Sequence, residues 1–484
     1  MGAVSRSYGE VFIANRWREP SSSEVIEVIA AHTEELIGTA PIAGPAEVDA
    51  AVGAARSCFD DGGWPRLPVG ERSEAVRRIA DGLAARADEM AELITGENGS
   101  PLAFSRQAQV GAPLDIYASM LDLAAGFDWE EHRPGRYLPH LVRHEPVGVV
   151  AAVVAWNVPQ VLIATKLAPA LLAGCPVIVK AAPEAALDAL LLAEIIAEAD
   201  LPAGTVSILT GGVPTGEALV AHPGIDKVAF TGSSGAGRRV AAACGQQLTR
   251  VSLELGGKSA TVWLDDVDLP AAVKGLRWTS FVNNGQACAA QTRVLAPRSR
   301  YGEVVAAVAA YADGLVVGDP FAPGTHIGPM VSARQRDRVR SYIELGQVDG
   351  ARLVAGGAGP PDGLDTGWYV RPTVFADVDN AMRIAKEEIF GPVLCVIAHD
   401  GDDDAVRLAN DSAYGLAGSV WSAEEGRALG VARRLRAGSV GINGYAPDTL
   451  APFGGYGASG MGREWGPEGF AEYLETTAIG GITG

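Results

Sequence analysis

Two kinds of apolar segment alternate along this chain, and they differ in length and in the spacing of their apolar residues. Short runs rich in Val, Ile and Ala are followed by longer Ala- and Leu-rich segments with helical spacing. This alternation is typical of βαβ units around a largely parallel sheet. In the first half it predicts strands at Val147–Val154, Val177–Lys180, Val206–Leu209 and Lys227–Phe230, with helices at Leu162–Leu172, Leu187–Glu198, Thr215–His222 and Gly237–Cys244.

The same alternation returns in the second half, after a glycine pair that follows Leu255 and that we interpret as a domain boundary. The predicted strands there are Ala260–Trp263, Arg293–Ala296, Val393–Ile397, Ser419–Trp421 and Ser439–Ile442. We therefore expect an α/β fold with two Rossmann-like parallel-sheet domains.

One segment breaks this alternation. Residues Phe127–Arg143 mix aromatic, His and Arg side chains around Pro134 and Gly135, as expected of exposed strands joined by a turn. We expect a two-stranded β-ribbon that serves as an oligomerisation arm. Ala-rich helices are also predicted at Glu47–Phe59 and from Glu71 to Ala85.

Composition narrows the class of protein. A chain of 484 residues, with 48% apolar residues and 60 glycines, suits a compact enzyme, and this length predicts about two to four domains. The formal net charge of -19 argues against nucleic acid or an anionic membrane surface as a partner, because both would repel the protein. The longest charge-free stretch, Val147–Thr165, is interrupted by Asn157 and Pro159, so no membrane-spanning segment is predicted.

Cysteine usage points to a reducing compartment. The chain has 5 cysteines, an odd number without paired spacing, and the residues from Met1 to Glu10 lack the apolar core of a secretory signal. We therefore expect a cytoplasmic protein. Cys288 differs from the others because it follows Asn283 and Gln286 in a turn-forming segment, which displays a thiol rather than burying it. The cysteines interpreted as packing residues are Cys58, Cys175, Cys244 and Cys395.

Three glycine-rich segments are similar to phosphate-binding loops. Gly455–Gly460 has GxGxxG spacing but no strand before it, and Gly256–Ser259 lacks the first glycine of a P-loop, so neither predicts a nucleotide site. Phe230–Gly237 follows a predicted strand and opens a predicted helix, where backbone amides can bind a pyrophosphate; an ordinary tight turn is the alternative. His140 and His144 lack the Glu of the HExxH motif, and we predict no metal site.

Together these segments resemble the NAD(P)-dependent aldehyde dehydrogenase superfamily, of the hydrolytic, non-acylating type, from about Phe12 to the C-terminal tail. The segments that carry the resemblance are Pro146–Pro159, Val177–Lys180, Phe230–Ser233, Leu253–Lys258, Asn283–Cys288, Glu387–Pro392, Pro452–Tyr456 and Ser459–Glu464. Two positions depart from the family pattern. Gly457 stands where the tail motif often has Lys, and Gly235 adds flexibility to the coenzyme turn.

The resemblance implies covalent catalysis on a carbonyl. Cys288 would attack an aldehyde as a thiolate, and Glu254 would activate the water that hydrolyses the resulting thioester. The Asn157 side-chain amide and the Cys288 backbone N–H would stabilise the oxyanion. Lys166 and Glu464 would pass protons near the site. From the residues alone, Lys166 also suits a solvated helix lysine, and Asn157 suits a helix N-cap.

The resemblance also implies coenzyme contacts. Lys180, at the end of a parallel strand, would bind the adenosine ribose, and Glu184 stands one residue after the position where many NAD-preferring members carry Glu. A carboxylate near the ribose repels a 2′-phosphate, so we expect NAD rather than NADP. The other expected coenzyme residues are Trp156, Gly232, Ser233, Leu255, Glu388 and Phe390. For Trp156 and Phe390 a packed core aromatic is the alternative.

By this resemblance the coenzyme-binding domain comprises residues 1–126 and 147–254, the catalytic domain 255–445, and the oligomerisation arm 127–146 and 466–484. We expect a homodimer or homotetramer. Two other functions stay open. One is a CoA-acylating aldehyde dehydrogenase or reductase, which would not need the base Glu254, and the other is a coenzyme-binding structural protein without turnover.

The substrate is predicted only as a class. The candidate residues that line the substrate tunnel are Gln160, Phe281, Ala287, Ala289 and Tyr445. Because none of them is Arg or Lys, we expect an apolar aliphatic or terpenoid aldehyde rather than an anionic semialdehyde.

Overall fold

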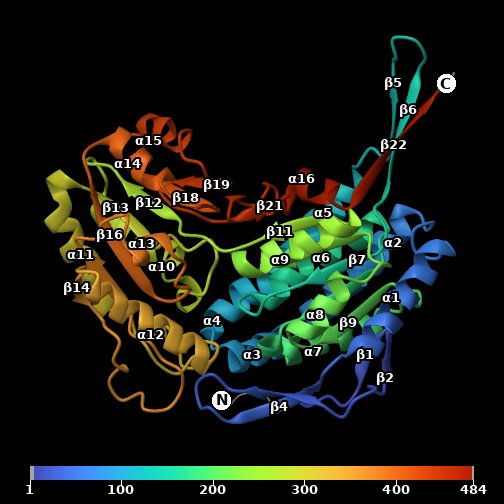
Figure 1. Ribbon diagram of the computed structural model, residues 1–484, viewed down its shortest axis with the longest axis horizontal. Helices are drawn as coiled ribbons and strands as arrows, with labels where there is room; N and C mark the ends of the chain where they lie inside the picture. Colours follow the sequence, from blue (N-terminus) through green and yellow to red (C-terminus); the bar gives the residue numbers. More distant parts are fainter. Residues whose placement is uncertain (1–4, 482–484) are drawn as a thin grey trace.

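Figure 1 shows the computed structural model of the chain, which describes residues 5–481. Two large sheets with their helices lie side by side, and a narrow ribbon projects from the body beside the C-terminal end (Figure 1). Within the described residues the first sheet has eight strands and the second has seven. The expected α/β fold with two parallel sheets and a ribbon is confirmed.

The central strands of the first sheet run parallel, and antiparallel strands close its two edges. In sheet order the strands are β2 (Arg16–Arg18), β1 (Val11–Ile13), β9 (Val206–Thr210), β8 (Val177–Ala181), β7 (Val150–Val153), β10 (Lys227–Thr231), β11 (Arg250–Glu254) and β21 (Gly460–Met461). Successive residues of β8 point to opposite faces, so Val177 and Val179 lie in one apolar core and Ile178 in the other. Burial of both faces explains why these strands are continuous apolar runs in the sequence.

Helices supply the other half of each core. Those that belong with the first sheet are α1 (Pro45–Asp60), α2 (Val69–Ala85), α3 (Ala87–Asn98), α4 (Leu102–Phe104), the π-helix η1 (Ser105–Gly111), α5 (Ala112–Ala125), α6 (Pro159–Ala173), the short 3-10 helix η2 (Pro183–Ala185), α7 (Ala186–Glu198), α8 (Val213–Val220) and α9 (Ser234–Gln247). Helix α6 begins at Pro159, because proline suits the first turn of a helix, where its missing N–H would have no partner.

The second sheet is parallel except for β14 at one edge. In sheet order its strands are β14 (Arg352–Ala355), β15 (Thr373–Ala376), β16 (Val393–His399), β13 (Arg293–Pro297), β12 (Ala260–Trp263), β18 (Ala417–Trp421) and β19 (Ser439–Ile442). Its helical segments are α10 (Leu269–Thr279), η3 (Val282–Gly285), η4 (Arg298–Arg300), α11 (Tyr301–Asp313), α12 (Ala333–Val348), α13 (Arg383–Lys386), α14 (Asp402–Asn410) and α15 (Glu425–Ala432). Strand β19 is an edge strand, so one side of its backbone is open to pairing.

The ribbon has a third strand that the sequence did not reveal. Strands β5 (Glu130–Arg133) and β6 (His140–Pro146) form the predicted hairpin, and β22 (Leu474–Gly480) pairs with the other edge of β6. The prediction of two strands was therefore wrong in number. Two small sheets complete the fold, namely the hairpin of β3 (Val25–Ile29) and β4 (Leu36–Pro41) and the pair β17 (Tyr414–Gly415) and β20 (Tyr456–Gly457).

The last part of the chain returns from the second sheet to the first. After β19 the red segment of Figure 1 runs back across the molecule, where β21 pairs with β11 and α16 (Gly466–Ala471) lies against α5 and α6. Residues distant in sequence therefore meet at the carboxyl ends of β10 and β11, the place where open α/β sheets bind ligands. None of the helices in residues 5–481 is long and apolar enough to cross a membrane.

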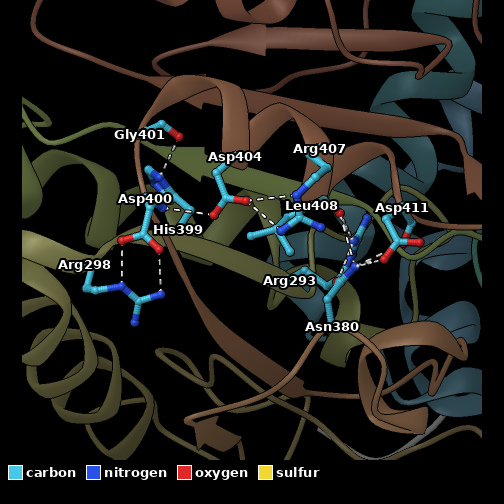
Figure 2. A network of polar contacts seen from close by, with 10 residues as sticks. All are labelled: Arg293, Arg298, Asn380, His399, Asp400, Gly401, Asp404, Arg407, Leu408 and Asp411. Atoms are coloured by element: carbon cyan, nitrogen blue, oxygen red, sulfur yellow. Dashed lines mark hydrogen bonds and ion pairs between the residues drawn. The ribbon is translucent and has the colours of Figure 1, made fainter.

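A buried guanidinium ties the second sheet to a helix end. Figure 2 shows Arg293 of β13 beside Asn380 and Leu408. Its side chain donates to the Asn380 Oδ1 at 3.0 Å, to the main-chain oxygens of Leu408 at 2.9 Å and Ala409 at 2.8 Å, and to the Lys258 oxygen at 2.9 Å. The C-terminal carbonyls of a helix lack intrahelical partners. Arg293 therefore supplies donors to the end of α14 and holds the segment that follows β11.

Candidate active site

Cys288 lies in a turn that needs an unusual backbone. Just before it, Asn283 (φ 50), Asn284 (φ 60) and Gly285 (φ 74) all adopt the left-handed region, which Asn tolerates better than most residues and Gly accepts freely. A Cβ at Gly285 would lie 2.3 Å from the main-chain carbon of Gly391, so no larger residue fits there. The turn leaves Cys288 half-buried, whereas the other four cysteines are buried.

The Cys288 thiol is protonated in this resting state. Burial first, and then the nearby carboxylates of Glu254 and Glu388, which disfavour a further negative charge, together raise the pKa of Cys288 to about 12. A thiolate nucleophile at this position therefore needs a base, or a ligand that changes these surroundings.

Glu254 is the last residue of β11. Its side chain is 4% exposed, and within the described residues neither carboxylate oxygen has a hydrogen-bond partner. Burial first, and then the charge of Glu464, raise the pKa of Glu254 well above its ordinary value, while Lys166 opposes this shift. A buried carboxyl group without partners destabilises a fold, so its presence points to a role in binding or chemistry.

Lys166 and Glu464 form a buried ion pair beside Glu254. The Lys166 Nζ donates to the Glu464 Oε1 at 2.6 Å and to the Thr231 Oγ1 at 2.7 Å. Lys166 is fully buried, so the alternative of a solvated helix lysine is wrong. The charges of both residues affect Glu254, which places three ionisable groups from α6, β11 and the C-terminal segment in one cluster.

Asn157 adjoins the nucleophile turn. Its Nδ2 donates to the main-chain oxygen of Gln286 at 3.1 Å, and its side chain is almost fully buried. The N-cap of α6 is Val158 rather than Asn157. The helix-cap interpretation is therefore wrong, because the chain enters the helix one residue later and the amide side chain points toward the turn of Cys288.

The predicted pyrophosphate turn opens α9. Ser233 is the N-cap residue, and its Oγ accepts from the Ala236 N–H at 3.3 Å, while the Gly232 N–H donates to the main-chain oxygen of Glu254 at 3.0 Å. A Cβ at Gly237 would lie 2.5 Å from the Leu255 side chain. The glycine thus lets Leu255 pack close beneath the helix, whose N-terminus is suited to an anion.

Lys180 and Glu184 lie on neighbouring elements. Lys180, in β8, is 7% exposed, and burial lowers the pKa of its ammonium group to about 8, with Glu184 opposing this shift. The Glu184 Oε1 lies 3.6 Å from the Arg334 Nη2, at the start of α12. A buried lysine at a strand end beside a carboxylate suits recognition of vicinal hydroxyl groups, to which the ammonium donates and from which the carboxylate accepts.

Trp156 and Phe390 meet across the two halves of the fold. Their rings lie edge to face, with centroids 5.4 Å apart and an interplanar angle of 90°. Both rings are half-buried, and Phe390 has a φ of 63, an uncommon value for a bulky residue. The interpretation of either ring as a fully packed core aromatic is therefore wrong. Nearby, the Glu388 Oε1 accepts from the Gly257 N–H at 3.0 Å.

Two predicted substrate-lining residues are not available to a substrate. Phe281 is fully buried and packs against Tyr311, and the Gln160 side chain donates to the Asp188 Oδ1 at 2.5 Å within the interior. These two predictions were wrong, because the side chains point into the cores. Ala287 and Ala289 are half-buried.

Tyr445 remains a candidate for contact with substrate. Burial raises the pKa of its phenol to about 12, and Cys288 and Glu254 contribute to the shift, so the ring lies near both groups. Its hydroxyl lies 2.9 Å from the Ser439 Oγ, at the start of β19.

Sequence reasoning missed a set of buried polar residues around the main chain of Asn157. They come from the end of α3, from η1 and from the nucleophile turn, and they are Asn98, Ser100, Gln109 and Asn283. In the sequence these residues are visible only as polar positions within segments that otherwise pack into the core. That pattern does not show that their side chains meet around the same peptide group.

Comparisons with known proteins agree over nearly the whole chain. The model of the "Aldehyde dehydrogenase family" matches residues 17–479. The chain is 47% identical to the geranial dehydrogenase of Castellaniella defragrans over 97% of this chain and 98% of that protein. Among solved structures it is similar to an aldehyde dehydrogenase of Mycobacterium tuberculosis complexed with NAD+, with a TM-score of 0.96, 47% identity and coverage of 98% of both chains.

A second solved structure is similar in the same way. It is a cysteine-to-alanine mutant of aldehyde dehydrogenase C from Pseudomonas syringae, complexed with NAD+ and octanal, with a TM-score of 0.95, 41% identity and coverage of 98% of this chain and 97% of that chain. Since the family model and these relatives span almost the full length, the chain belongs to the aldehyde dehydrogenase family.

Proposed function

We propose that this protein oxidises an aldehyde to the carboxylic acid with NAD, through a covalent bond to Cys288. The balanced reaction is aldehyde + NAD+ + water → carboxylate + NADH + two protons. The observation that carries the proposal is the buried, unpartnered carboxyl group of Glu254 beside the half-buried thiol of Cys288. A hydrolytic enzyme needs both groups, since one forms the thioester and the other activates the water that cleaves it.

In the first step Cys288 adds to the aldehyde. The thiol proton passes to Glu254, whose raised pKa makes its carboxylate a better proton acceptor than an ordinary one. The sulfur–carbon bond forms, and the carbonyl oxygen becomes an oxyanion. The Asn157 Nδ2 has a second N–H beyond the one that binds Gln286, and together with the Cys288 backbone N–H it stabilises this charge.

The residues that would hold NAD fit its chemistry. The ammonium group of Lys180 and the carboxylate of Glu184 suit the adenosine ribose, and the α9 N-terminus at Gly232 and Ser233 suits the pyrophosphate. The bound coenzyme would supply a hydride acceptor, and with loss of its hydride the thiohemiacetal carbon on Cys288 would become the thioester carbon. The further proposed coenzyme contacts are Trp156, Leu255, Glu388 and Phe390.

Before the second step the Lys166 and Glu464 pair carries the thiol proton away from Glu254, because the three groups already share one electrostatic cluster. Glu254 then accepts a proton from water, and the hydroxide adds to the thioester carbon. The carbon–sulfur bond breaks, the acid leaves, and the Cys288 thiolate takes the proton back from Glu254, which restores the resting thiol.

The proposed substrate is an apolar aliphatic or terpenoid aldehyde. Ala287, Ala289 and Tyr445 offer no cationic group to an anionic semialdehyde, and two similar proteins are named for geranial or bound to octanal. We expect kcat/KM for octanal to exceed that for succinic semialdehyde by at least about tenfold, since desolvating an unpaired carboxylate is unfavourable. The reverse order in steady-state assays would contradict this substrate class.

We also propose a cytoplasmic homodimer or homotetramer. A reduced Cys288 suits a reducing compartment, and the open edge of β19 and the free edges of the ribbon suit strand pairing between subunits. In this assembly residues 1–126 and 147–254 form the coenzyme domain, 255–445 the catalytic domain, and 127–146 with 466–484 the arm. Residues 1–4 and 482–484 of these ranges lie outside the described residues.

The deciding experiment follows NADH formation from octanal and NAD, with the purified protein, its Cys288→Ala variant and a parallel reaction with NADP. Wild-type turnover to octanoic acid, lost in Cys288→Ala, supports the proposal. Turnover only when CoA is present would instead indicate an acylating enzyme. NAD binding without turnover of any aldehyde in a panel would indicate a non-catalytic protein.

A further inference from the structure

The main-chain carbonyl of Asn157 accepts hydrogen bonds from three amide side chains. The donors are the Asn283 Nδ2 at 2.8 Å, the Gln109 Nε2 at 3.2 Å and, more weakly, the Asn98 Nδ2 at 3.5 Å. The acceptors of most side-chain amides are backbone groups or water. Here three buried amides from separate elements converge on one peptide group.

Two of these donors belong to a closed ring of hydrogen bonds. The Gln109 Nε2 also donates to the Ser100 Oγ at 2.8 Å, and the Ser100 Oγ donates to the Asn283 Oδ1 at 2.5 Å. Asn283 in turn donates to the Asn157 oxygen. Ser100 and Gln109 are fully buried, and Asn157 and Asn283 are 5% and 2% exposed, so water does not compete for these bonds.

The hydrogen bonds of the ring require a particular kind of donor at position 109. The single hydroxyl hydrogen of Ser100 is used for Asn283, so Gln109 must donate to both the Ser100 Oγ and the Asn157 oxygen. Only a group with two hydrogens on one atom does this, as the amide nitrogen of Gln does. Within the described residues the Gln109 Oε1 has no partner, so the side chain serves the ring through its nitrogen alone.

The backbone that carries Gln109 is itself unusual. Gln109 lies in the π-helix η1, seven residues between α4 and α5, and π-helical turns are rare and occur frequently at functional sites. The Oγ atoms of Ser105 and Thr95 lie 2.8 Å apart and join the start of this turn to α3. Gln109 faces the interior, whereas Gln107 on the same turn is exposed.

We propose that Gln109, together with Ser100, is a positioning residue that fixes the Asn157 peptide and thereby aims the Asn157 amide at the oxyanion. This inference rests on the proposed role of Asn157 as an oxyanion donor. The same ring also fixes Asn283 at the start of the nucleophile turn, so the donor and the nucleophile are held by one set of hydrogen bonds. Gln109 is fully buried, and its side chain donates to the Ser100 Oγ and the Asn157 oxygen, so it would act through Asn157.

Gln109→Met removes both donors at similar side-chain volume. Removal of one oxyanion donor typically costs about 100- to 1000-fold in kcat, and a misplaced donor retains part of its effect. We therefore expect kcat to fall about 10- to 100-fold with KM for octanal changed less than about threefold, because an interaction made in the transition state is affected. Ser100→Ala breaks the ring with a smaller change, and we expect kcat to fall about 3- to 30-fold.

The matched control is Gln107→Met, the same substitution on the exposed side of the π-helix, which should retain wild-type kcat. NADH formation in a single turnover reports the chemical step, and the Kd for NAD and the Tm report the coenzyme site and the fold. Ser100→Ala supplies the test if Gln109→Met does not fold. Wild-type kcat in the folded ring variants would overturn the proposal.

A double-mutant cycle with Asn157→Ala tests the path of the effect. If Gln109 acts through the Asn157 amide, adding Gln109→Met to Asn157→Ala should slow kcat by no more than about threefold further. Full additivity of the two losses would overturn the positioning role. Wild-type kcat in Asn157→Ala alone would contradict the oxyanion role in the proposed function, whereas a slow Asn157→Ala beside a fast Gln109→Met contradicts only the present inference.

Discussion

Burial raises the pKa of both Cys288 and Glu254 in the same direction. The charge of Glu254 disfavours a thiolate at Cys288, so the resting site holds a proton on the thiol, and Glu254 keeps its own proton to higher pH than an ordinary Glu does. Such a site is protected from unwanted oxidation, because the reactive thiolate is scarce until substrate and coenzyme bind.

The first prediction concerns pH. Glu254 acts as a base only when it has lost its proton, and its raised pKa moves that event to higher pH; the Cys288 thiol, with a pKa of about 12, loses its proton later still. We expect kcat/KM to rise from pH 6 to pH 9, as measured by initial rates of NADH formation. A profile that is flat above pH 5, as an ordinary Glu would give, is the contrary result.

The second prediction concerns the base. Glu254→Gln retains the shape of the side chain but removes the base, and loss of a general base slows its step about 100- to 10,000-fold. Because Glu254 accepts a proton in both proposed steps, we expect the NADH formed in the first turnover and the steady-state rate of NADH formation both to slow, as measured by rapid-mixing absorbance. A first turnover and a steady state as fast as those of wild type would show that another group accepts these protons.

For single residues, the sequence was most informative where a residue type has few other structural roles in its surroundings. Cys288 was recognisable because turn formers surround it, and Glu254 because apolar residues and glycines do. Asn157 was also found, but the same residue suits a helix cap, and only the position of Val158 decides between the two. Gln109 gave no signal, because neither a π-helix nor a shared acceptor is visible in one sequence.

At the scale of elements, the second sheet depends on a buried cation, Arg293. Its hydrogen bonds go to uncharged oxygen atoms rather than to a carboxylate. Arg293 binds carbonyl oxygens and an amide oxygen, and burial lowers the pKa of its guanidinium to about 10. The bonds replace the water that the group loses on burial, so each acceptor matters more than it would at the surface.

The third prediction compares Arg293 with Arg298, two of the three arginines of Figure 2. Arg293→Met leaves the carbonyls at the end of α14 without donors, and we expect the free energy of unfolding in urea to fall by about 2 to 4 kcal/mol. Arg298 pairs with Asp400 at the surface, where the two side chains are 62% and 60% exposed. Arg298→Met should therefore cost less than about 1 kcal/mol. Equal losses in both variants would refute this view of the network.

The fourth prediction concerns the interface of α3, α6 and α7. The Glu97 carboxylate accepts from the N–H groups of Leu187 and Asp188 at the start of α7, and burial raises the pKa of Asp188 to about 7. The unfolded chain loses the Asp188 proton near pH 4, whereas the folded chain retains it up to about pH 7. Stability from this group therefore falls as pH rises from 4 to 7.

Asp188→Asn removes that titration and retains an acceptor for Gln160. We expect the Tm of the variant to exceed that of wild type at pH 8 and to approach it at pH 5. Scanning calorimetry at the two pH values checks this, and an identical difference at both would exclude Asp188 as the source of the pH dependence.

Elements buried on both faces were the most predictable. Strand β12 (Ala260–Trp263) has the predicted bounds, and most other predicted strands of the two sheets differ by one or two residues at an end. Of the edge strands, β19 (Ser439–Ile442) was predicted with its bounds, whereas β2, β14 and β21 were missed, since they are short and owe their extended form to a neighbour rather than to local pattern. Strand β22 was missed for the same reason.

At the scale of the whole molecule, the site is assembled from both sheets. Cys288 comes from the second half, Asn157 and Glu254 come from the first sheet and its loops, and Glu464 returns from the end of the chain. Motif order revealed these residues, but not the path of residues 453–480, because a returning segment has no periodic signal.

The fifth prediction concerns assembly. Tyr137 and Leu138 at the ribbon tip are 86% and 54% exposed, an arrangement that suits contact with another subunit. Replacing residues 130–143 with a short Gly-Ser linker should yield a monomer by light scattering, with a mass slightly below the 50.1 kDa of the full chain. As a control, Leu248→Ser removes an equally exposed apolar residue, 90% exposed, away from the ribbon, and should leave the mass unchanged. An intact oligomer without the ribbon would exclude it as the arm.

The segment of residues 453–480, which returns to the first sheet, also affects when the site is completed during synthesis. A ribosome releases the N-terminal part first, and domains generally fold in that order. Strand β11 then has no β21 beside it, and Lys166 has no Glu464, until the last part of the chain emerges. Cys288, Glu254 and the turn at Gly232 are all synthesised before Glu464, which completes the proposed proton path. A growing chain therefore carries the Cys288 thiol through the last part of its synthesis without a complete site, and the site is complete only when residues 453–480 are in place.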